Sequence, residues 1–241
     1  MVALAFEMKL SQAEVYEVAT FYHHFDVIKE DQTPPPPLTV RVCESLSCEM
    51  SGAKKLTETL KQLFPDGSVP SEQIRIQAVP CVGRCQHAPV AVVGKNPVDQ
   101  ATPELVKKHV EKNEVLPTLP EYVNFAEYQQ SGGYQLFQDC LSGKRDAESV
   151  ITELKNSGLR GLGGAGFPVG SKWEIVRKFP EPRLMAVNID EGEPGTFKDR
   201  YYLESDPHRF LEGSLIAAWA VGIEEIYIYL RDEYAASLEI L

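Results

Sequence analysis

Residues 42–48 read Val-Cys-Glu-Ser-Leu-Ser-Cys, and residues 80–85 read Pro-Cys-Val-Gly-Arg-Cys. The spacings are Cys43-x4-Cys48 and Cys81-x3-Cys85, and each pair comes just after a predicted strand. Structural zinc sites favour cysteines two residues apart, and neither pair has that spacing. Thiolates from two loops can instead supply two ligands to each iron of a 2Fe–2S cluster. The spacing therefore favours an iron–sulfur cluster, with zinc as the alternative.

The residues around these cysteines predict a small domain over 38–115. Strand patterns occur at 38–42, 74–79 and 89–93, and helical periodicity occurs at 52–64 and from Thr102 onward, where Pro103 takes the first helical position. The order β-α-β-β-α suits a two-layer α/β domain. In this reading, Cys48 lies in a loop and a helix starts at Ser51.

An N-terminal helical segment, residues 1–33, precedes this domain, and four prolines at 34–37 separate the two. Ser11 and Glu14 form a capping box that begins a helix predicted over 11–26. The first residues have no basic region before their apolar ones, so they do not form a signal peptide.

The composition limits the partners. Lys and Arg number 24 and Asp and Glu 35 among 241 residues, which gives a net charge of −11. This balance argues against nucleic acid and against an anionic membrane. The longest uncharged run, 214–223, has about half the length of a membrane span. We therefore expect a soluble, cytoplasmic protein with reduced thiols and no membrane insertion, in which Cys140 is an ordinary buried thiol.

The second domain is predicted over residues 131–241, after a linker at 116–130. Helices are expected at 134–141, 146–157, 207–221 and up to 241, and strands at 183–188 and 226–230. Strand–helix–strand–helix order predicts parallel strands joined by a right-handed crossover. Two strands cannot form a sheet with both faces covered, so we expect this chain to be the front part of a longer polypeptide.

A glycine-rich loop is predicted at 161–170. Gly161, Gly163 and Gly166 fit G-x-G-x-x-G, but they follow a helix, whereas the ordinary dinucleotide fingerprint follows a strand. A flexible surface loop is the alternative. Glycines let the backbone approach a flat or phosphorylated ligand, and backbone N–H groups together with Lys172 can hold a phosphate.

Three carboxylates, Asp190, Glu191 and Glu193, follow the strand predicted at 183–188. Open α/β sheets bind ligands at the carboxyl ends of their parallel strands, which is where these side chains are expected. A solvated acidic turn is the alternative, and on charge alone it would be preferred.

The first half of the chain resembles the thioredoxin-like 2Fe–2S ferredoxin, which is also the small NADH-dehydrogenase subunit of respiratory complex I. The resemblance rests on 42–48, on 80–85 and on Ala88-Pro89, and residues 13–22 resemble the last helix of that subunit's N-terminal bundle. It implies that one 2Fe–2S cluster is held by Cys43, Cys48, Cys81 and Cys85.

The second half resembles the flavin subunit of complex I and related NAD-linked enzymes over 157–173, 190–199 and 206–213. This implies a Rossmann-like FMN/NAD-binding domain that is incomplete at its C-terminus, with the family's 4Fe–4S cysteines expected only in a further region. The positions implied to contact FMN are Gly161, Gly163, Gly164, Gly166, Lys172, Asn188 and Asp190. Those implied to lie where NAD(H) stacks on the flavin are Phe167 and the two catalytic carboxylates, Glu191 and Glu193.

In complex I these modules are separate subunits, whereas here the ferredoxin precedes the flavin domain in one chain. That order, with Leu162 and residues 229–234, resembles the β subunit of soluble NAD-dependent formate dehydrogenases. The resemblance implies a diaphorase that passes hydride between NAD(H) and FMN and single electrons to iron–sulfur clusters. Its implied partner is a formate-oxidising molybdenum or tungsten subunit, or other iron–sulfur subunits of a hetero-oligomer. The alternatives are a complex I-like or hydrogenase flavin subunit and a non-catalytic 2Fe–2S relay.

Overall fold

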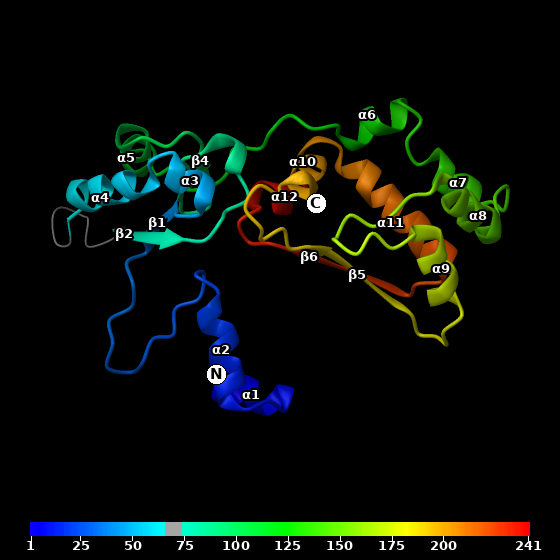
Figure 1. The fold of residues 1–241 in the computed structure, drawn as a ribbon, viewed down its shortest axis with the longest axis horizontal. Helices are drawn as coiled ribbons and strands as arrows, with labels where there is room; N and C mark the ends of the chain where they lie inside the picture. The colour runs from blue at the N-terminus through cyan, green and yellow to red at the C-terminus, as the bar shows by residue number, and fades with distance from the viewer. Residues whose placement is uncertain (66–73) are drawn as a thin grey trace. The chain divides into compact units, whose positions relative to one another are not determined.

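The structure is a computed structural model that describes residues 1–65 and 74–241. The chain divides into two compact units, Met1–Leu116 and Pro117–Leu241 (Figure 1). Among the described residues, no helix combines the length and the apolar character needed to cross a bilayer.

The first unit is built on a four-stranded sheet with the order β2-β1-β3-β4. Strand β1 (Leu38–Cys43) runs parallel to β2 (Ile74–Val79) and antiparallel to β3 (Ala91–Val93), which pairs with β4 (Asn96–Val98). The two long helices that pack on the sheet are α4 (Ala53–Leu63) and α5 (Pro103–Glu111). This arrangement confirms the predicted two-layer α/β domain and adds β4 to it.

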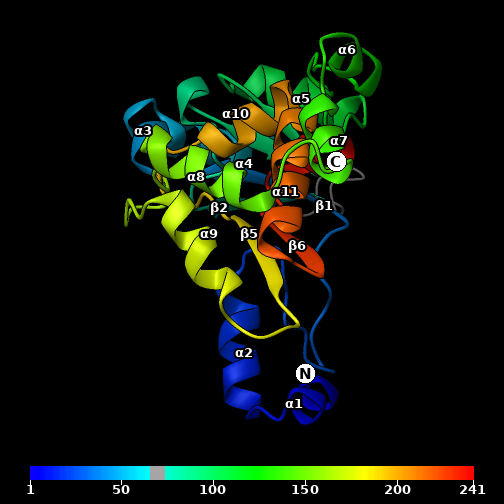
Figure 2. The ribbon, with the colours of Figure 1, turned by 90° about the vertical axis from the view of Figure 1, so that its right-hand side faces the viewer.

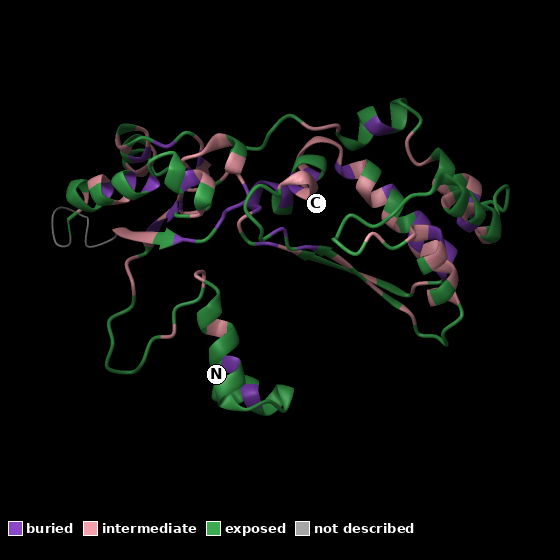
Figure 3. Cartoon of the chain, viewed as in Figure 1, coloured by how far each residue is buried: buried purple, intermediate pink, exposed green. Residues whose placement is uncertain are grey.

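Alternation along the central strand β1 builds the core of this unit. Val40 and Val42 are fully buried and belong to one core cluster with Leu60 of α4 and Val106 of α5. Buried residues are coloured purple in Figure 3. The predicted cap of α5 is confirmed, because Thr102 Oγ1 accepts a 3.2 Å hydrogen bond from the Leu105 amide.

The prediction for the residues between β1 and α4 is wrong. Cys48 does not lie in a loop but in a short helix, α3 (Leu46–Met50), which follows the extended Ser45. Gly52, at φ 93°, adopts a left-handed conformation and separates α3 from α4. The residues at 51–52 therefore form the break between two helices, whereas the sequence pattern predicts a single helix start there.

The N-terminal segment forms α1 (Val2–Met8) and α2 (Gln12–Phe21). The capping box is confirmed, with 3.2 Å from the Glu14 amide to Ser11 Oγ and 2.8 Å from the Ser11 amide to Glu14 Oε2. The predicted end at residue 26 is wrong, because the helix stops at Phe21. Asp26 accepts hydrogen bonds of 2.7 and 3.0 Å from the Arg75 guanidinium on β2, which fixes this carboxylate against the sheet.

Helix α11 (Pro207–Val221) is central to the second unit. It connects two parallel strands, β5 (Leu184–Ile189) and β6 (Glu225–Leu230), as the sequence predicts. Asp206 begins the helix, since its Oδ1 accepts a hydrogen bond from the Arg209 amide, and Gly222 ends it in a left-handed conformation.

Other helices pack around α11 (Figure 2). They are α6 (Phe125–Gln130), α7 (Gln135–Leu141), α8 (Ala147–Ser157), α9 (Val169–Arg177) and α10 (Lys198–Ser205), and α12 (Ala235–Ile240) packs on α10. The predicted helices correspond to α7, α8 and α12, whereas α9 and α10 are additional. Helix α6 lies inside the predicted linker, because a second capping box, Asn124 with Glu127, begins a helix there.

Helix α9 also includes the last residues of the segment predicted as the glycine-rich loop. Gly170 is its second residue and packs directly on α8. A Cβ atom at this position would lie 2.6 Å from the backbone nitrogen of Lys155. The glycine therefore permits close helix packing, which composition alone cannot distinguish from loop flexibility.

Candidate functional site

The first candidate site is the group of four cysteines in the first unit. Cys43 is the last residue of β1, Cys48 lies in α3, Cys81 follows β2, and Cys85 begins a short 3-10 turn. Because β1 and β2 are parallel and in register, with Cys43 opposite Val79, their ends deliver both pairs to the same edge of the sheet. Cys43, Cys48 and Cys81 are at most 2% exposed.

Contacts between the thiols confirm that the two pairs meet. The Sγ atoms of Cys81 and Cys85 lie 3.3 Å apart. The Cys43 thiol interacts electrostatically with both Cys48 and Cys81 and therefore lies between the two pairs. The Gly83 amide donates to Cys81 Sγ at 3.4 Å, and its positive φ of 70° is a backbone conformation that suits glycine.

The thiols cannot ionise independently. The interaction with Cys48 raises the pKa of Cys43; the interaction with Cys81 opposes this rise and burial adds to it. The interaction with Cys43, followed by burial, raises the pKa of Cys81. The interaction with Cys43 lowers the pKa of Cys48. If these four neighbouring thiols, three of them buried, were all ionised, they would need cationic charge among them, which a metal centre supplies.

The spread of the sulfur atoms bears on which metal centre fits. Within the described parts of the chain, no three cysteine sulfurs all lie within 4.8 Å of one another. A single tetrahedral zinc ion, with Zn–S bonds of about 2.3 Å, would place all four within roughly 3.8 Å of each other. A 2Fe–2S cluster requires only that each iron bind its own pair, which the paired arrangement fits.

The second candidate site is a cavity of about 610 Å³ in the second unit. A glycine-rich tongue, residues 159–168, forms one wall. Its base is closed by hydrogen bonds of 2.9 Å from the Gly161 amide to the Phe167 carbonyl and from the Val169 amide to the Leu159 carbonyl. Strand β5 and helices α9 and α11 form the other walls.

Six residues predicted from the sequence line this cavity: Gly161, Gly163, Gly166, Phe167, Lys172 and Asn188. Gly164 and Asp190 are exposed in the adjoining loops and do not line it. Trp173 belongs to the motif identified from the sequence, but sequence reasoning missed the other apolar walls, which include Met185, Ala217 and Val221. The only local signal for these apolar wall residues was the alternation of Met185 and Val187 along β5. Ala217 and Val221 come from α11, which lies in a distant part of the sequence.

The cavity fits a flat, phosphorylated ligand. Glycines along the tongue leave backbone amides accessible, and no heavy atom within 4 Å would meet a Cβ at Gly163 or Gly166. Lys172 adds a cation at one edge, while the other walls are mostly apolar. These are the features that an isoalloxazine ring and a ribityl phosphate require.

Glu191 and Glu193 occupy different environments. Glu191 is 5% exposed, and its carboxylate accepts hydrogen bonds from the Asp199 amide at 3.0 Å, the Lys198 ammonium at 3.1 Å and the Tyr234 hydroxyl at 3.2 Å. Burial acts to raise its pKa, but the Asp199 amide and Lys198 outweigh burial, so the pKa is lowered. Glu193 is exposed in the loop before α10.

Arg231 fixes the acidic loop to the end of β6. Its guanidinium donates to the Glu191 carbonyl and pairs with Glu233 at 3.1 Å. The loop after β5 and the turn after β6 are thereby held together at the carboxyl ends of the two parallel strands.

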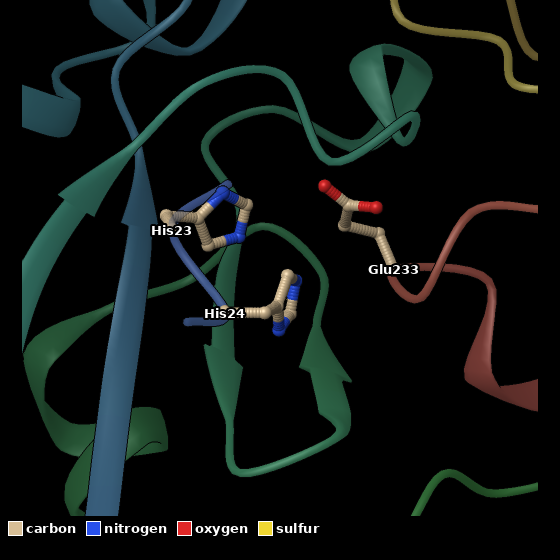
Figure 4. A group of neighbouring side chains, drawn as sticks. All are labelled: His23, His24 and Glu233. Carbon is tan, nitrogen blue, oxygen red and sulfur yellow. The ribbon is translucent and has the colours of Figure 1, made fainter. Parts of the chain in front are cut away.

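Figure 4 labels His23, His24 and Glu233. The two histidine rings contact each other, with centroids 4.1 Å apart, in the segment after α2. The two histidines belong to the first unit and Glu233 belongs to the second, so the three residues are not grouped as one site.

Both units match known families. Residues 1–114 match the thioredoxin-like [2Fe-2S] ferredoxin family, and residues 154–241 match the Nuo51 FMN-binding domain of complex I 51 kDa subunits. The chain therefore has the fold of a thioredoxin-like 2Fe–2S ferredoxin domain followed by an FMN-binding domain. Over residues 154–241 it is similar, more particularly, to the FMN-binding domain of complex I 51 kDa subunits. The predicted fold class is confirmed, and the matches support 2Fe–2S, FMN and NAD(H) as its cofactors.

Similar proteins include subunits of NADH-quinone oxidoreductase. The chain is 46% identical over 122 residues to one such subunit in Aquifex aeolicus (strain VF5) and 42% identical over 121 residues to another in Rhizobium meliloti (strain 1021). These alignments cover 51% and 50% of this chain but 28% of each relative.

A solved structure of NAD+-reducing [NiFe]-hydrogenase in the air-oxidised state superposes with a TM-score of 0.77 at 26% identity. The superposition covers 99% of this chain and 44% of the hydrogenase chain. It therefore includes both units of the present chain.

Proposed function

We propose that this chain is an NAD(H)-linked diaphorase module that passes hydride between NAD(H) and FMN and single electrons to iron–sulfur clusters. The observation that carries the proposal is the cavity in the second unit, which six of the residues predicted to contact the cofactors line together. The four neighbouring thiols of the first unit support the second half of the proposal, because they provide the ligands of a one-electron centre.

The residues of this chain have separate roles in binding the flavin. The Gly163 amide of the tongue, together with Lys172, would hold the phosphate, and Asn188 would contact the flavin from the end of β5. Gly161 would line the site with its amide bonded to the Phe167 carbonyl. Phe167 lies at the base of the tongue, where its side chain is 48% exposed and accessible to a second ring. When bound, FMN accepts two electrons as hydride and releases them singly, which links NAD(H) to iron–sulfur centres.

Glu193 is the carboxylate that we propose to act beside NAD(H). It is exposed, and a carboxylate there orients the nicotinamide and favours its oxidised, cationic form. Asp190 and Glu191 complete the acidic loop. Because Glu191 is buried in its network of donors, its contribution is to fix the position of the loop.

A visible spectrum of the purified chain tests this function. We expect flavin and iron–sulfur absorbance together, with both bleached anaerobically by NADH. Iron–sulfur absorbance without a flavin band would favour the non-catalytic relay. A preparation that contains zinc alone would contradict both assignments.

The finer proposal concerns the partner. We propose the diaphorase of an NAD-dependent formate dehydrogenase, in which a molybdenum or tungsten subunit oxidises formate, because of the domain order and residues 229–234. A second candidate is the flavin subunit of an NAD+-reducing hydrogenase, which is favoured by the superposition over 99% of the chain. The complex I-like alternative is supported by the alignment with a subunit of NADH-quinone oxidoreductase, which covers 51% of this chain.

Affinity purification of the native complex distinguishes these candidates. The purified complex would be assayed for NAD+ reduction with formate or with hydrogen, and for quinone reduction with NADH. We expect formate to support NAD+ reduction. Activity with hydrogen alone, or with quinone alone, assigns the chain to the corresponding alternative.

A further inference from the structure

An ion pair holds the loop between the second pair of cysteines. Arg84 lies between Cys81 and Cys85. Its Nε and Nη2 atoms each donate a 2.7 Å hydrogen bond to the carboxylate of Asp99, which follows β4. Both side chains are shielded, with Arg84 17% and Asp99 31% exposed. Two parallel bonds of this kind fix the plane of the guanidinium as well as its charge.

The backbone beyond Asp99 is fastened to the same loop. The Gln100 amide donates to the His87 carbonyl at 2.8 Å, and the Ala101 amide donates to the Pro89 carbonyl at 2.7 Å. Nε2 of His87 lies 3.7 Å from the Asp99 carboxylate. Residues 99–101 therefore bind the loop after Cys81 at Arg84, His87 and Pro89. Among residues 99–101, Asp99 supplies the charged side chain.

Arg84 directly precedes Cys85 in the sequence, so the pair brings one positive and one negative charge into the loop that carries two proposed cluster ligands. Uptake of one electron would add one negative charge to a cluster held by these cysteines. A cation nearby favours that uptake and an anion opposes it, and partial burial weakens solvent screening of both. With the pair intact, the carboxylate of Asp99 offsets much of the effect of Arg84.

We propose that the Arg84–Asp99 ion pair sets the reduction potential of the cluster, with both residues acting as positioning residues and neither as a ligand. The proposal rests on the assignment of the four cysteines as ligands. It does not depend on FMN or NAD(H), because a chemical reductant delivers the electron directly.

The test is a titration with dithionite and redox mediators on the full chain with its cluster, followed by visible absorbance and electron paramagnetic resonance. Asp99→Asn removes the negative charge that faces Arg84, so we expect a higher potential than in the wild type. Arg84→Gln leaves the carboxylate, so we expect a lower one. Each shift should change the equilibrium constant for reduction by about tenfold, which is about 59 mV for one electron. The double variant should return toward the wild-type value.

Asp26→Asn is the matched control. It breaks another two-bond pair of the same unit, with Arg75 on β2. Arg75 is in register with Thr39, four residues before Cys43 along β1, or roughly 13 Å away at strand spacing. We expect this variant to keep the wild-type potential.

Opposite shifts in the two single variants support the proposal, whereas shifts of the same sign, or no shift with full iron content, overturn it. If Arg84→Gln loses iron, Arg84→Lys keeps the charge and replaces it in the test. A reduction potential of Arg84→Lys near the wild-type value then supports the proposal. A lower potential, at which the equilibrium constant for reduction has fallen tenfold or more, overturns it. Failure of the diaphorase function appears separately, as a normal potential with no reduction by NADH.

Discussion

Tyr128 on α6 donates a 2.6 Å hydrogen bond from its hydroxyl group to Oε2 of Glu212 on α11, 84 residues further along the chain. The same carboxylate accepts hydrogen bonds from the backbone amides of Tyr134 at 2.9 Å and Phe137 at 3.2 Å. Glu212 is 7% exposed. One buried carboxylate thus fixes α6 and the start of α7 to the helix that also forms a wall of the flavin cavity.

Tyr128→Phe should destabilise the second unit. The substitution removes a hydrogen bond to a buried charged acceptor, which contributes about 1.5–3 kcal/mol. Urea unfolding monitored by circular dichroism measures the loss. Tyr201→Phe is the control, because that side chain is 61% exposed and its change should stay within about 0.5 kcal/mol. Equal midpoints for the two variants would show that the Glu212 bond contributes nothing measurable.

Cys81→Ser should remove about two equivalents of iron, since a 2Fe–2S cluster depends on all four of its ligands. Metal analysis with a sulfide count checks the result. Cys140→Ser is the control, because Cys140 is buried on α7 in the other unit. It should leave the iron content unchanged. Full iron content in the Cys81 variant would refute the ligand assignment.

Glu191 should make the second unit sensitive to acid. Its pKa is lowered in the folded protein, so its contribution to stability is fully present above the unfolded value of about 4.3. That contribution disappears as the pH falls through the folded value. Urea midpoints of the wild type and of Glu191→Gln, measured between pH 7 and pH 3, should therefore differ most at neutral pH and converge in acid. A difference that grows in acid would contradict the sign of the shift.

Glu193→Gln should retain FMN but lower kcat/KM for NADH. The loss of one charge-assisted hydrogen bond, about 1.5–3 kcal/mol, corresponds to roughly ten- to hundredfold. NADH:ferricyanide kinetics with a flavin count measure both properties. Glu239→Gln, at an exposed position on α12, is the control. An unchanged kcat/KM in the Glu193 variant would remove it from the site, and lost flavin would assign it a structural role instead.

Features set by neighbouring residues could be predicted from the sequence. The capping box at Ser11 forms as expected, and caps also form at Thr102, Asp146 and Asp206, because each bond spans only three residues. The two cysteine pairs come together because β1 and β2 pair in parallel, and alternation along each strand does not specify that direction. The end of α2 at Phe21 was not predicted, and Asp26 beyond it contacts Arg75, 49 residues later in the chain.

The candidate site shows the same division. The glycines and Lys172 could be identified locally, but the apolar walls from α11 could not. The acidic loop at 190–193 is uniform in sequence. The structure separates Glu191 from Glu193 because Tyr234, 43 residues later, comes into contact with one of them. The sequence next to the acidic loop does not indicate such a distant partner.

The pairing of β5 with β6 bears on how the protein should be handled. In the described part of the second unit, the sheet has only these two strands, and each strand has a second edge that their ladder does not use. Leu184, Tyr227 and Tyr229 are each more than half exposed on them. Edges of this kind template the addition of strands from other molecules. We expect this stretch of chain, expressed alone, to self-associate as its concentration rises, with light scattering that increases before any loss of helical signal.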